Sequence, residues 1–263
     1  MDEEIRQRLL ELNRQFYARV AAPFDATRRS WTPGLLAIVP HLWEGIKERP
    51  LTVLDVGCGN GRLARLLEHQ GLECRYTGVD GCSQLLERAR AQTQGLGRVA
   101  VALHQVDLAD PGWARGLDAH GYHVVVCLAT LQHLPGEDLR ARVVADLARL
   151  ARRRVILSCW QFLDSPRLAA RCLDWSQVGI PAQAVEPGDA LLPWRQAVEA
   201  LRYVHQVDAA ELGRLARGAG LSLRALFRAD GREGNLNLYA ILEPVGDGAS
   251  RVPDSSHARE HRP

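Results

Sequence analysis

The sequence predicts an α/β fold, in which a doubly wound, mostly parallel seven-stranded sheet is preceded by helices and carries an insert after its fifth strand. Between residues 51 and 159, short apolar runs alternate with segments of helical periodicity. A glycine-rich stretch follows the first of these runs, and acidic residues follow the next two. Such alternation places parallel strands in one sheet with right-handed crossovers, and a ligand site lies at the carboxyl ends of the central strands.

Composition is consistent with one globular domain and excludes several classes of protein. The 263 residues are 46% apolar, and no stretch reaches the ~20 apolar residues of a membrane span. The charged amino terminus lacks an apolar signal region, so we expect a cytoplasmic protein without membrane contact. A net charge of +2 is too small to indicate nucleic-acid binding by itself. The six cysteines are scattered without a CxxC pair, so we expect neither disulfides nor a metal site.

The first elements along the chain are helical. Residues 1–49 are expected to form an N-terminal helical segment, because apolar residues recur at helical spacing before and after a breaker region that runs from Pro23 to Pro33. Pro50 closes this segment.

Residues 50–243 are expected to form the sheet domain. Five strands are predicted near residues 51–56, 75–79, 99–106, 122–128 and 155–159. The three arginines at 152–154 are interpreted as a solvated turn before the fifth strand. A helix near 209–217 and strands near 221–227 and 236–242 complete the domain.

An insert interrupts this domain after the fifth strand. Residues 160–206 contain four prolines and three tryptophans, and an insert beside a ligand site often serves as a lid or binds substrate. The tail at 244–263, rich in glycine, serine, proline and charge, is expected to be disordered.

The glycine-rich stretch carries the strongest chemical signal. It begins with Asp55 and continues through Gly57, Gly59 and Gly61, at a strand end and directly before a helix. Glycine lets the backbone approach a ligand closely and adopt conformations closed to other residues. A dinucleotide site requires glycine one position after Gly61, where this chain has Arg62. The pattern D-x-G-x-G-x-G is instead that of the methyltransferase loop, which receives the amino acid end of S-adenosylmethionine.

Two further acids follow the next strands. Asp80 ends the second strand and is expected to accept hydrogen bonds from both ribose hydroxyls, and Asp107 follows the third strand and is expected to accept from the adenine amino group. Either acid alone fits an ordinary cap or turn, but acids at the ends of three successive strands are hard to produce by accident. His133, after the fourth strand, would lie beside the transferring methyl group, although a lone histidine is more often structural than catalytic.

The chain resembles the class I S-adenosylmethionine-dependent methyltransferases over residues 50–160, on the strength of residues 55–61, Asp80, Asp107 and the turn at 132–134. The resemblance implies a Rossmann-like methyltransferase fold with S-adenosyl-L-methionine as cofactor. It implies cofactor contacts from Asp55, Gly57, Cys58, Gly59, Asp80, Gly81, Asp107, Leu108 and Leu128.

A narrower resemblance lies outside that core. Residues 24–31, 188–194, 202–212 and 234–236 resemble, in order and spacing, the tRNA methyltransferases that esterify 5-carboxymethyluridine at the wobble position. The chain departs from that family at residues 132–133, where the family shows two histidines, and at residues 31–33, where it shows a tryptophan–proline pair. The resemblance implies tRNA as the acceptor and, as for some family members, a small activator protein as a partner.

The expected chemistry agrees with an acidic acceptor. A carboxylate is already ionised near neutral pH, so methyl transfer to it needs a clamp that holds it in place rather than a strong base. Arginine is suited to that clamp, and Arg28, Arg195 and Arg202 lie in segments that would flank the pocket. Catalytic roles are expected for four residues: His133, Arg28, Arg202 and Tyr203.

The aromatic residues of the same segments would serve an RNA acceptor. Tyr203, His205, Trp31 and Trp194 are expected to stack on or hydrogen-bond a splayed-out base. Each of them alone fits surface or packing duty at least as well.

Two alternatives remain open. The first is a methyltransferase that acts on a small-molecule acid or phenol, with a closed, apolar pocket lined by the insert and no affinity for tRNA. The second is a catalytically silent scaffold that only binds the cofactor. The intact acids and glycines of the donor site disfavour the scaffold, and detection of any methylated product would exclude it.

Overall fold

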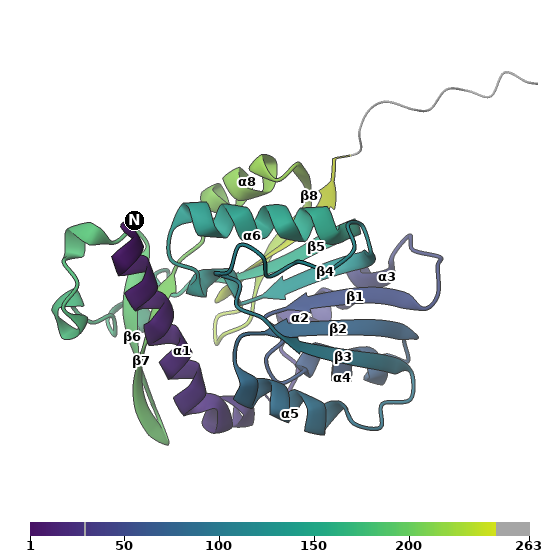
Figure 1. Cartoon of the computed structure of the whole chain (residues 1–263), viewed down its shortest axis with the longest axis horizontal. Coiled ribbons are helices and arrows are strands. Elements are labelled where there is room, and N and C mark those ends of the chain that lie inside the picture. Colours follow the sequence, from purple (N-terminus) through teal and green to yellow (C-terminus); the bar gives the residue numbers. More distant parts are fainter. Residues whose placement is uncertain (29, 246–263) are drawn as a thin grey trace, which may run out of the picture.

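A computed structural model of the protein describes residues 1–28 and 30–245, and it shows a seven-stranded sheet with helices on both faces (Figure 1). The strand order is β3-β2-β1-β4-β5-β9-β8. The first five strands are parallel, whereas β9 runs antiparallel to both β5 and β8. The strands are β1 (Leu51–Val56), β2 (Cys74–Asp80), β3 (Val99–Gln105), β4 (Tyr122–Leu128), β5 (Ala151–Trp160), β8 (Leu221–Ala229) and β9 (Asn237–Pro244). The predicted fold class is confirmed.

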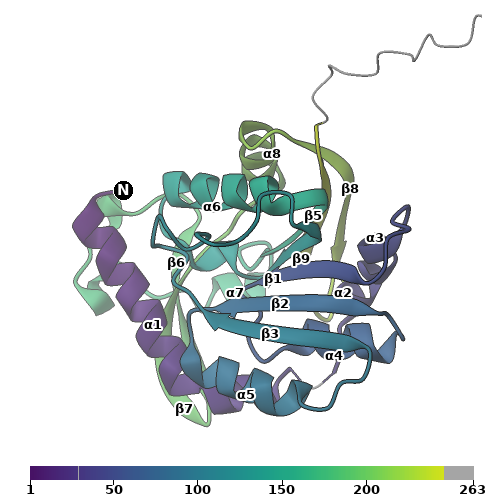
Figure 2. The ribbon, with the colours of Figure 1, turned by 45° about the vertical axis from the view of Figure 1, so that its right-hand side comes forward.

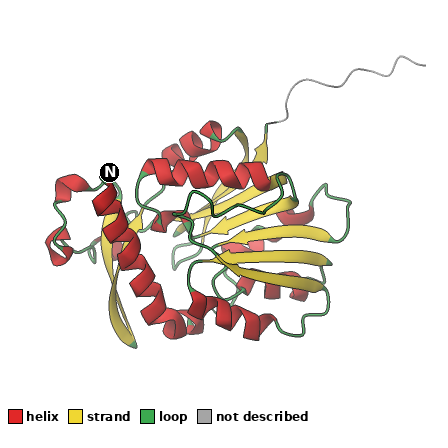
Figure 3. Ribbon diagram, viewed as in Figure 1, coloured by secondary structure: helices red, strands yellow, loops and turns green. Residues whose placement is uncertain are grey.

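The core consists of two apolar layers, one on each face of the sheet. Helices α6 (Glu137–Leu150) and α8 (Ala209–Gly218) cover one face, and α4 (Arg62–His69) and α5 (Ser83–Thr93) cover the other (Figure 3). Consecutive residues of β4 alternate between the layers, since Val125 packs under α6 while Val124 and Val126 pack in the opposite layer. A strand buried on both faces therefore forms from an unbroken apolar run.

The N-terminal segment is one long helix followed by two short ones. Helix α1 (Glu3–Ala26) begins at Asp2, whose side chain accepts a hydrogen bond from the amide of Glu4 at 2.8 Å. It continues through Pro23, where the sequence predicted a break. The expected second helix is divided into α2 (Pro33–Ala37) and α3 (Val39–Trp43), because proline is best accommodated in the first turn of a helix and Pro40 lies in the first turn of α3. No described helix combines the length and the apolar character that crossing a bilayer requires.

The insert is more regular than the sequence suggested. It contains the short helices α7 (Pro166–Ala169), η2 (Trp175–Val178) and η3 (Ala182–Ala184), and a separate antiparallel hairpin of β6 (Asp189–Gln196) and β7 (Val198–His205). Pro193 lies inside β6, and a proline within an apolar run argues against a strand when only the sequence is read. Helix α1 runs along this hairpin beside the carboxyl ends of the parallel strands (Figure 2).

The interpretation of residues 152–154 as a solvated turn was wrong, because β5 starts at Ala151 and includes all three arginines. Arg154 is 5% exposed and is stabilised there by Glu243 of β9, whose Oε1 lies 3.1 Å from Nε, and by the carbonyl oxygen of His41 at 2.7 Å from Nη1. The predicted disordered tail lies outside the described residues, apart from Pro244 and Val245.

Candidate active site

A cavity of about 760 Å³ opens at the carboxyl ends of β1, β2 and β4. Its walls come from the loops after these strands and β3, from the inner side of α1, and from β7 of the insert. All nine residues predicted for the cofactor line this one cavity: Asp55, Gly57, Cys58, Gly59, Asp80, Gly81, Asp107, Leu108 and Leu128. Among the four residues predicted as catalytic, Arg28, His133 and Arg202 line it as well.

The loop after β1 depends on glycine for its shape. Gly57, Gly59 and Gly61 have φ angles of 78°, 55° and 73°, in the left-handed region that other residues rarely adopt. A Cβ atom at Gly57 would lie only 2.1 Å from Oγ1 of Thr130, so this position has no room for a side chain. At Gly59 no atom lies within 4 Å of the place where a Cβ would stand, so the backbone there faces open space beside the cavity.

We predict that Gly59→Ala weakens cofactor binding more than it weakens the fold. Gly45→Ala is a matched control, since Gly45 also has a positive φ, of 71°, with no neighbour within 4 Å, but lies outside the cavity. Both variants should lose about 1–2 kcal/mol of unfolding free energy from backbone strain. Only Gly59→Ala should lose affinity for S-adenosylhomocysteine, by about tenfold to a hundredfold, because its methyl group enters the ligand's space. Calorimetric titration measures the affinity and chemical denaturation measures the unfolding free energy. Equal affinity in both variants would contradict a role of the glycine loop in binding the cofactor.

Each of the predicted acids is held by donors from the protein. Asp80 accepts from the amide of Gly59 at 2.9 Å and from the amide of Cys82 at 2.8 Å, one on each oxygen. Burial raises the pKa of Asp80 even though these two donors oppose the rise. Each oxygen keeps a second lone pair, which suits the two hydroxyls of a ribose.

The other two acids flank Asp80 along the same edge. Burial raises the pKa of Asp55 to about 7, although the hydroxyl of Tyr76 donates to it at 2.6 Å. Asp107 accepts from the amide of Ala109 and, through its other oxygen, from Arg14 of α1, both at 2.9 Å. The residues present therefore fit S-adenosylmethionine: the glycine loop would hold its amino acid end, Asp80 its ribose and Asp107 its adenine.

His133, which follows β4, lines the cavity in a defined tautomer. Its Nδ1 lies 3.4 Å from the carbonyl oxygen of Tyr203, and its Nε2 lies 2.7 Å from the hydroxyl of Tyr17 on α1. Since a carbonyl only accepts, Nδ1 carries the proton and Nε2 accepts from Tyr17. Burial, with a further contribution from the charge of Arg202, lowers the pKa of His133 to about 3. The imidazole is therefore neutral at physiological pH.

Arg202 is held by aromatic rings instead of an acid. Its guanidinium carbon lies 4.8 Å from the ring centre of Trp160, 5.4 Å from Phe16 and 5.9 Å from Trp194. No carboxylate of the described residues forms an ion pair with it, and its buried Nε has no hydrogen-bond partner among them. Burial lowers the pKa of Arg202, but a guanidinium stays charged in a protein.

Two further arginines of the cavity also lack a carboxylate partner in the described part of the chain. Arg28 lies 4.6 Å over the ring of Phe24, and neither Arg28 nor Arg62 of α4 has a carboxylate within ion-pair distance in the part of the chain described. Asp230, an acid that lines the same cavity, has partners of its own, because it accepts from the amide of Gly34, from Asn237 and from Tyr239 at 2.6–2.8 Å. Arg28, Arg62 and Arg202 are thus cations of the cavity without a carboxylate partner among the described residues, and this favours an anionic group in a ligand.

Tyr203 does not line the cavity, so its predicted contact with the acceptor requires correction. Tyr203 is 0% exposed, and its hydroxyl donates to Asp189 at 2.7 Å. His205 and Trp194, expected to stack on a base, are only 2% and 9% exposed, and Trp31 packs against His69 with ring centres 4.4 Å apart. Tyr17, Arg14 and Arg62 also line the cavity but were not predicted, because nothing in the local sequence pattern separates them from other residues of a helix.

Comparisons with known proteins agree with this geometry. Residues 53–154 match the family described as a methyltransferase domain. The chain is 34% identical over 105 residues to trans-aconitate 2-methyltransferase of Streptomyces avermitilis, a match that covers 39% of this chain and 35% of that enzyme. It is 31% identical over 178 residues to ubiquinone biosynthesis O-methyltransferase of Thiobacillus denitrificans, which covers 66% of each protein. The chain thus spans about a third of the length of the first relative and 66% of the second.

The fold also matches solved structures. Magnesium protoporphyrin IX methyltransferase from Synechocystis PCC 6803, solved with bound SAH, superimposes with a TM-score of 0.61 at 20% identity, covering 89% of this chain and 99% of that one. The sheet order, the glycine loop with its three acids and the matched family lead to one assignment. The chain belongs to the class I S-adenosylmethionine-dependent methyltransferases.

Proposed function

We propose that the protein esterifies a carboxylate of a small acidic molecule, with S-adenosylmethionine as methyl donor. The observation that carries this proposal is Arg202, a partly buried cation of the cavity that three aromatic rings hold in place and that no carboxylate of residues 1–28 and 30–245 neutralises. A planar guanidinium with free N–H groups binds a carboxylate through paired hydrogen bonds. Arg28 extends the positive wall of the same cavity.

The state of His133 favours a carboxylate over a phenol. When bound, S-adenosylmethionine supplies an electrophilic methyl group on its sulfonium. A phenol, with a pKa near ~10, must lose its proton before or during attack, whereas a carboxylate with a pKa near ~4 is already ionised. A histidine whose pKa is about 3 is a poor base for a phenol. It instead accepts a hydrogen bond from Tyr17 and keeps that hydroxyl oriented beside Arg202.

The two relatives support a small acceptor rather than tRNA. Their names give trans-aconitate, an acid, and an O-methylation in ubiquinone biosynthesis. Tyr203, His205 and Trp194 are too buried to stack on a splayed-out base without a rearrangement of the hairpin. The insert instead contributes Trp160 and Arg202 to the cavity, as expected for an acceptor enclosed by the protein. A tRNA acceptor and a small activator protein remain predictions from the resemblance alone.

The test incubates the purified protein with S-adenosylmethionine labelled on its methyl group and, in separate reactions, three classes of acceptor. These are aliphatic and aromatic carboxylic acids, phenols, and tRNA treated with base to convert methyl esters into carboxylates. We expect label in one or more acids, released as methanol by mild alkali because it is an ester.

The other outcomes assign a different function. Alkali-stable label in a phenol would overturn the carboxylate assignment, and label in tRNA would restore the wobble-uridine hypothesis. Binding of S-adenosylhomocysteine without any labelled product would favour the silent scaffold. Turnover that starts only after addition of a partner protein would support the predicted activator.

A further inference from the structure

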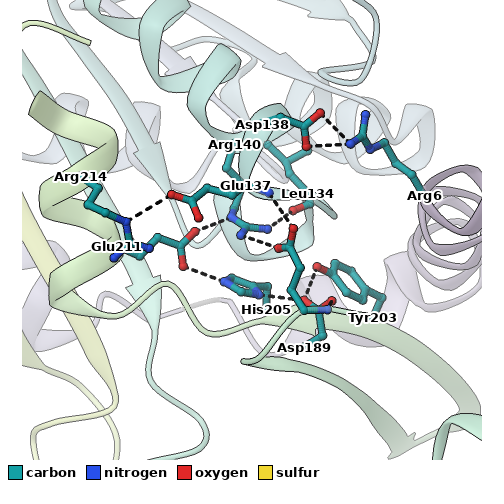
Figure 4. Close-up of polar contacts among 11 residues, drawn as sticks. Arg6, Leu134, Glu137, Asp138, Arg140, Asp189, Tyr203, His205, Glu211 and Arg214 are labelled. Atoms are coloured by element: carbon teal, nitrogen blue, oxygen red, sulfur yellow. Dashed lines mark hydrogen bonds and ion pairs between the residues drawn. The ribbon is translucent and has the colours of Figure 1, made fainter. Parts of the chain in front are cut away.

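A buried ion network lies behind the acceptor side of the cavity, centred on His205 of β7 (Figure 4). Its Nδ1 lies 2.7 Å from Oδ1 of Asp189 on β6, and its Nε2 lies 2.8 Å from Oε2 of Glu211 on α8. The three side chains are at most 9% exposed. Because each ring nitrogen faces a carboxylate, the arrangement favours an imidazolium with a proton on both nitrogens.

Arg140 of α6 joins this histidine to the rest of the domain. Its guanidinium contacts Glu211 at 2.7 Å, Glu186 at 2.9 Å and the carbonyl oxygen of Leu134 at 3.0 Å, and its side chain is 1% exposed. The network thus holds three carboxylates and, with a protonated His205, two cations. Loss of the histidine proton would leave Arg140 alone against three negative charges, an arrangement that burial penalises strongly.

The network is closed by the protein's own groups. Ligand atoms of Glu186, Asp189 and His205 come within 4.8 Å of one another, a spacing that a cation could use. Each of these atoms already has a partner, because Arg140 contacts Glu186 and the hydroxyl of Tyr203 donates to Asp189. We therefore interpret the cluster as a structural ion network of the hairpin and not as a metal site.

Tyr203 links this network to the cavity. Its hydroxyl donates to Asp189, its carbonyl accepts from His133 at 3.4 Å, and its amide donates to Asn13 of α1 at 2.9 Å. Neighbouring residues of a strand point to opposite faces, so Arg202 faces the cavity while Tyr203 and His205 face the network. Any shift of β7 relative to α6 and α8 therefore displaces Arg202 and disturbs the contact between Tyr203 and His133, which lies in the turn before α6.

We propose that His205 and Arg140 are positioning residues for the acceptor. Their ion pairs with the three carboxylates hold β7 in the position in which Arg202 and His133 face the cavity. Loss of the His205 proton then loosens the acceptor clamp and leaves the cofactor side unchanged, since the glycine loop and Asp80 contact none of these groups. The part of the proposal that concerns acceptor affinity rests on the proposed function, and the part that concerns the hairpin does not.

The sign of the pH dependence follows from the surroundings of His205. Burial alone would lower its pKa, but the hydrogen bonds to Asp189 and Glu211 outweigh it, and the net pKa is raised. The groups that face the ring are Asp189 of β6, Glu211 of α8, Arg140 of α6, Glu186 of the loop before β6 and Tyr203 of β7. Tyr203 stays neutral, because burial raises its pKa. The stabilisation is complete below the unfolded pKa of about 6.5 and is lost as pH rises through the raised folded value.

The wild-type protein provides the first test without any substitution. Nitrogen NMR should show a doubly protonated His205 at pH 7. Amide exchange of residues 189–205, corrected for the intrinsic rate, should lose protection with the same midpoint as the ring titration. The KM for the acidic acceptor should rise about tenfold to a hundredfold across that midpoint, while kcat and the affinity for S-adenosylhomocysteine stay within about twofold.

Substitutions separate the positioning role from general stability. His205→Gln should show the raised KM at every pH, with no midpoint left in either KM or exchange. Arg214→Gln is the matched control, because Arg214 forms an exposed pair with Glu137 at 3.3 Å beside the network and should change neither quantity.

Two results would overturn the proposal. A neutral His205 at pH 7 would do so, and so would a KM midpoint that persists unchanged in His205→Gln. If no acid is methylated at all, the NMR and exchange measurements still decide whether the imidazolium holds the hairpin, so failure of the proposed function remains distinguishable from failure of this inference.

Discussion

Arg202→Ala is expected to lower kcat/KM for the acidic acceptor by about 30-fold to several thousandfold, which corresponds to about 2–5 kcal/mol for removing one partner of a buried charged contact. The affinity for S-adenosylhomocysteine should stay within about twofold. The reason is spatial, because Arg202 projects from β7 among Phe16, Trp160 and Trp194, whereas the predicted cofactor contacts come from the strand ends. Steady-state kinetics and calorimetric titration measure the two quantities.

Controls make the Arg202 result specific. Arg195→Ala removes an exposed arginine from the same hairpin, outside the cavity, and should leave kcat/KM unchanged. Arg202→Lys should recover only part of the activity, since an ammonium cannot form the paired, planar contact of a guanidinium. Unchanged turnover in Arg202→Ala would remove the clamp from the mechanism, and equal losses in the Arg195 and Arg202 variants would indicate a general effect of charge.

Arg140→Met is expected to lower the free energy of unfolding by about 3–5 kcal/mol. Methionine has a similar length but no charge, so the buried Glu211 and the partly exposed Glu186 would lie beside Asp189 with only His205 to balance them. The carbonyl oxygen of Leu134 would also lose its donor. For a protein of this size the melting temperature should fall by about 6–20 °C, measurable by calorimetry together with urea denaturation.

The exposed ion pair of Arg214 and Glu137 provides the comparison for Arg140. Arg214→Met should cost less than about 1 kcal/mol, because both partners of that pair are about half exposed and solvent screens their attraction. If both substitutions cost equally little, the buried network is not needed for the fold. A stable Arg140→Met protein with a raised KM would separate the positioning role from the structural one.

The cofactor side of the cavity was predictable because the residue patterns that mark it are local in the sequence. Each of Asp55, Asp80 and Asp107 follows a short apolar run, and parallel strands bring their carboxyl ends to the same edge of a sheet. Three residues far apart in sequence must then converge once the alternation of strands and helices is recognised. The glycines are also readable, because their positive φ angles are a property of the chain at that point.

The side of the cavity that is expected to bind the methyl acceptor was predictable only in part. Arg28, His133 and Arg202 were recognised and do line the cavity, but Tyr203 was grouped with Arg202 although adjacent residues of a strand face opposite sides. That alternation was hidden because Pro193 obscured the hairpin in the sequence.

The class of fold and the edge of the sheet where the predicted cofactor contacts converge both follow from short-range patterns of apolar residues, glycines and acids. Which charges are neutralised, by contrast, depends on how distant segments pack. Arg140 and Arg202 are alike as residues, yet one meets two carboxylates of distant segments and the other meets aromatic rings and a cavity. The partner of a charge depends on packing between elements that are remote in the chain, and no local pattern encodes it.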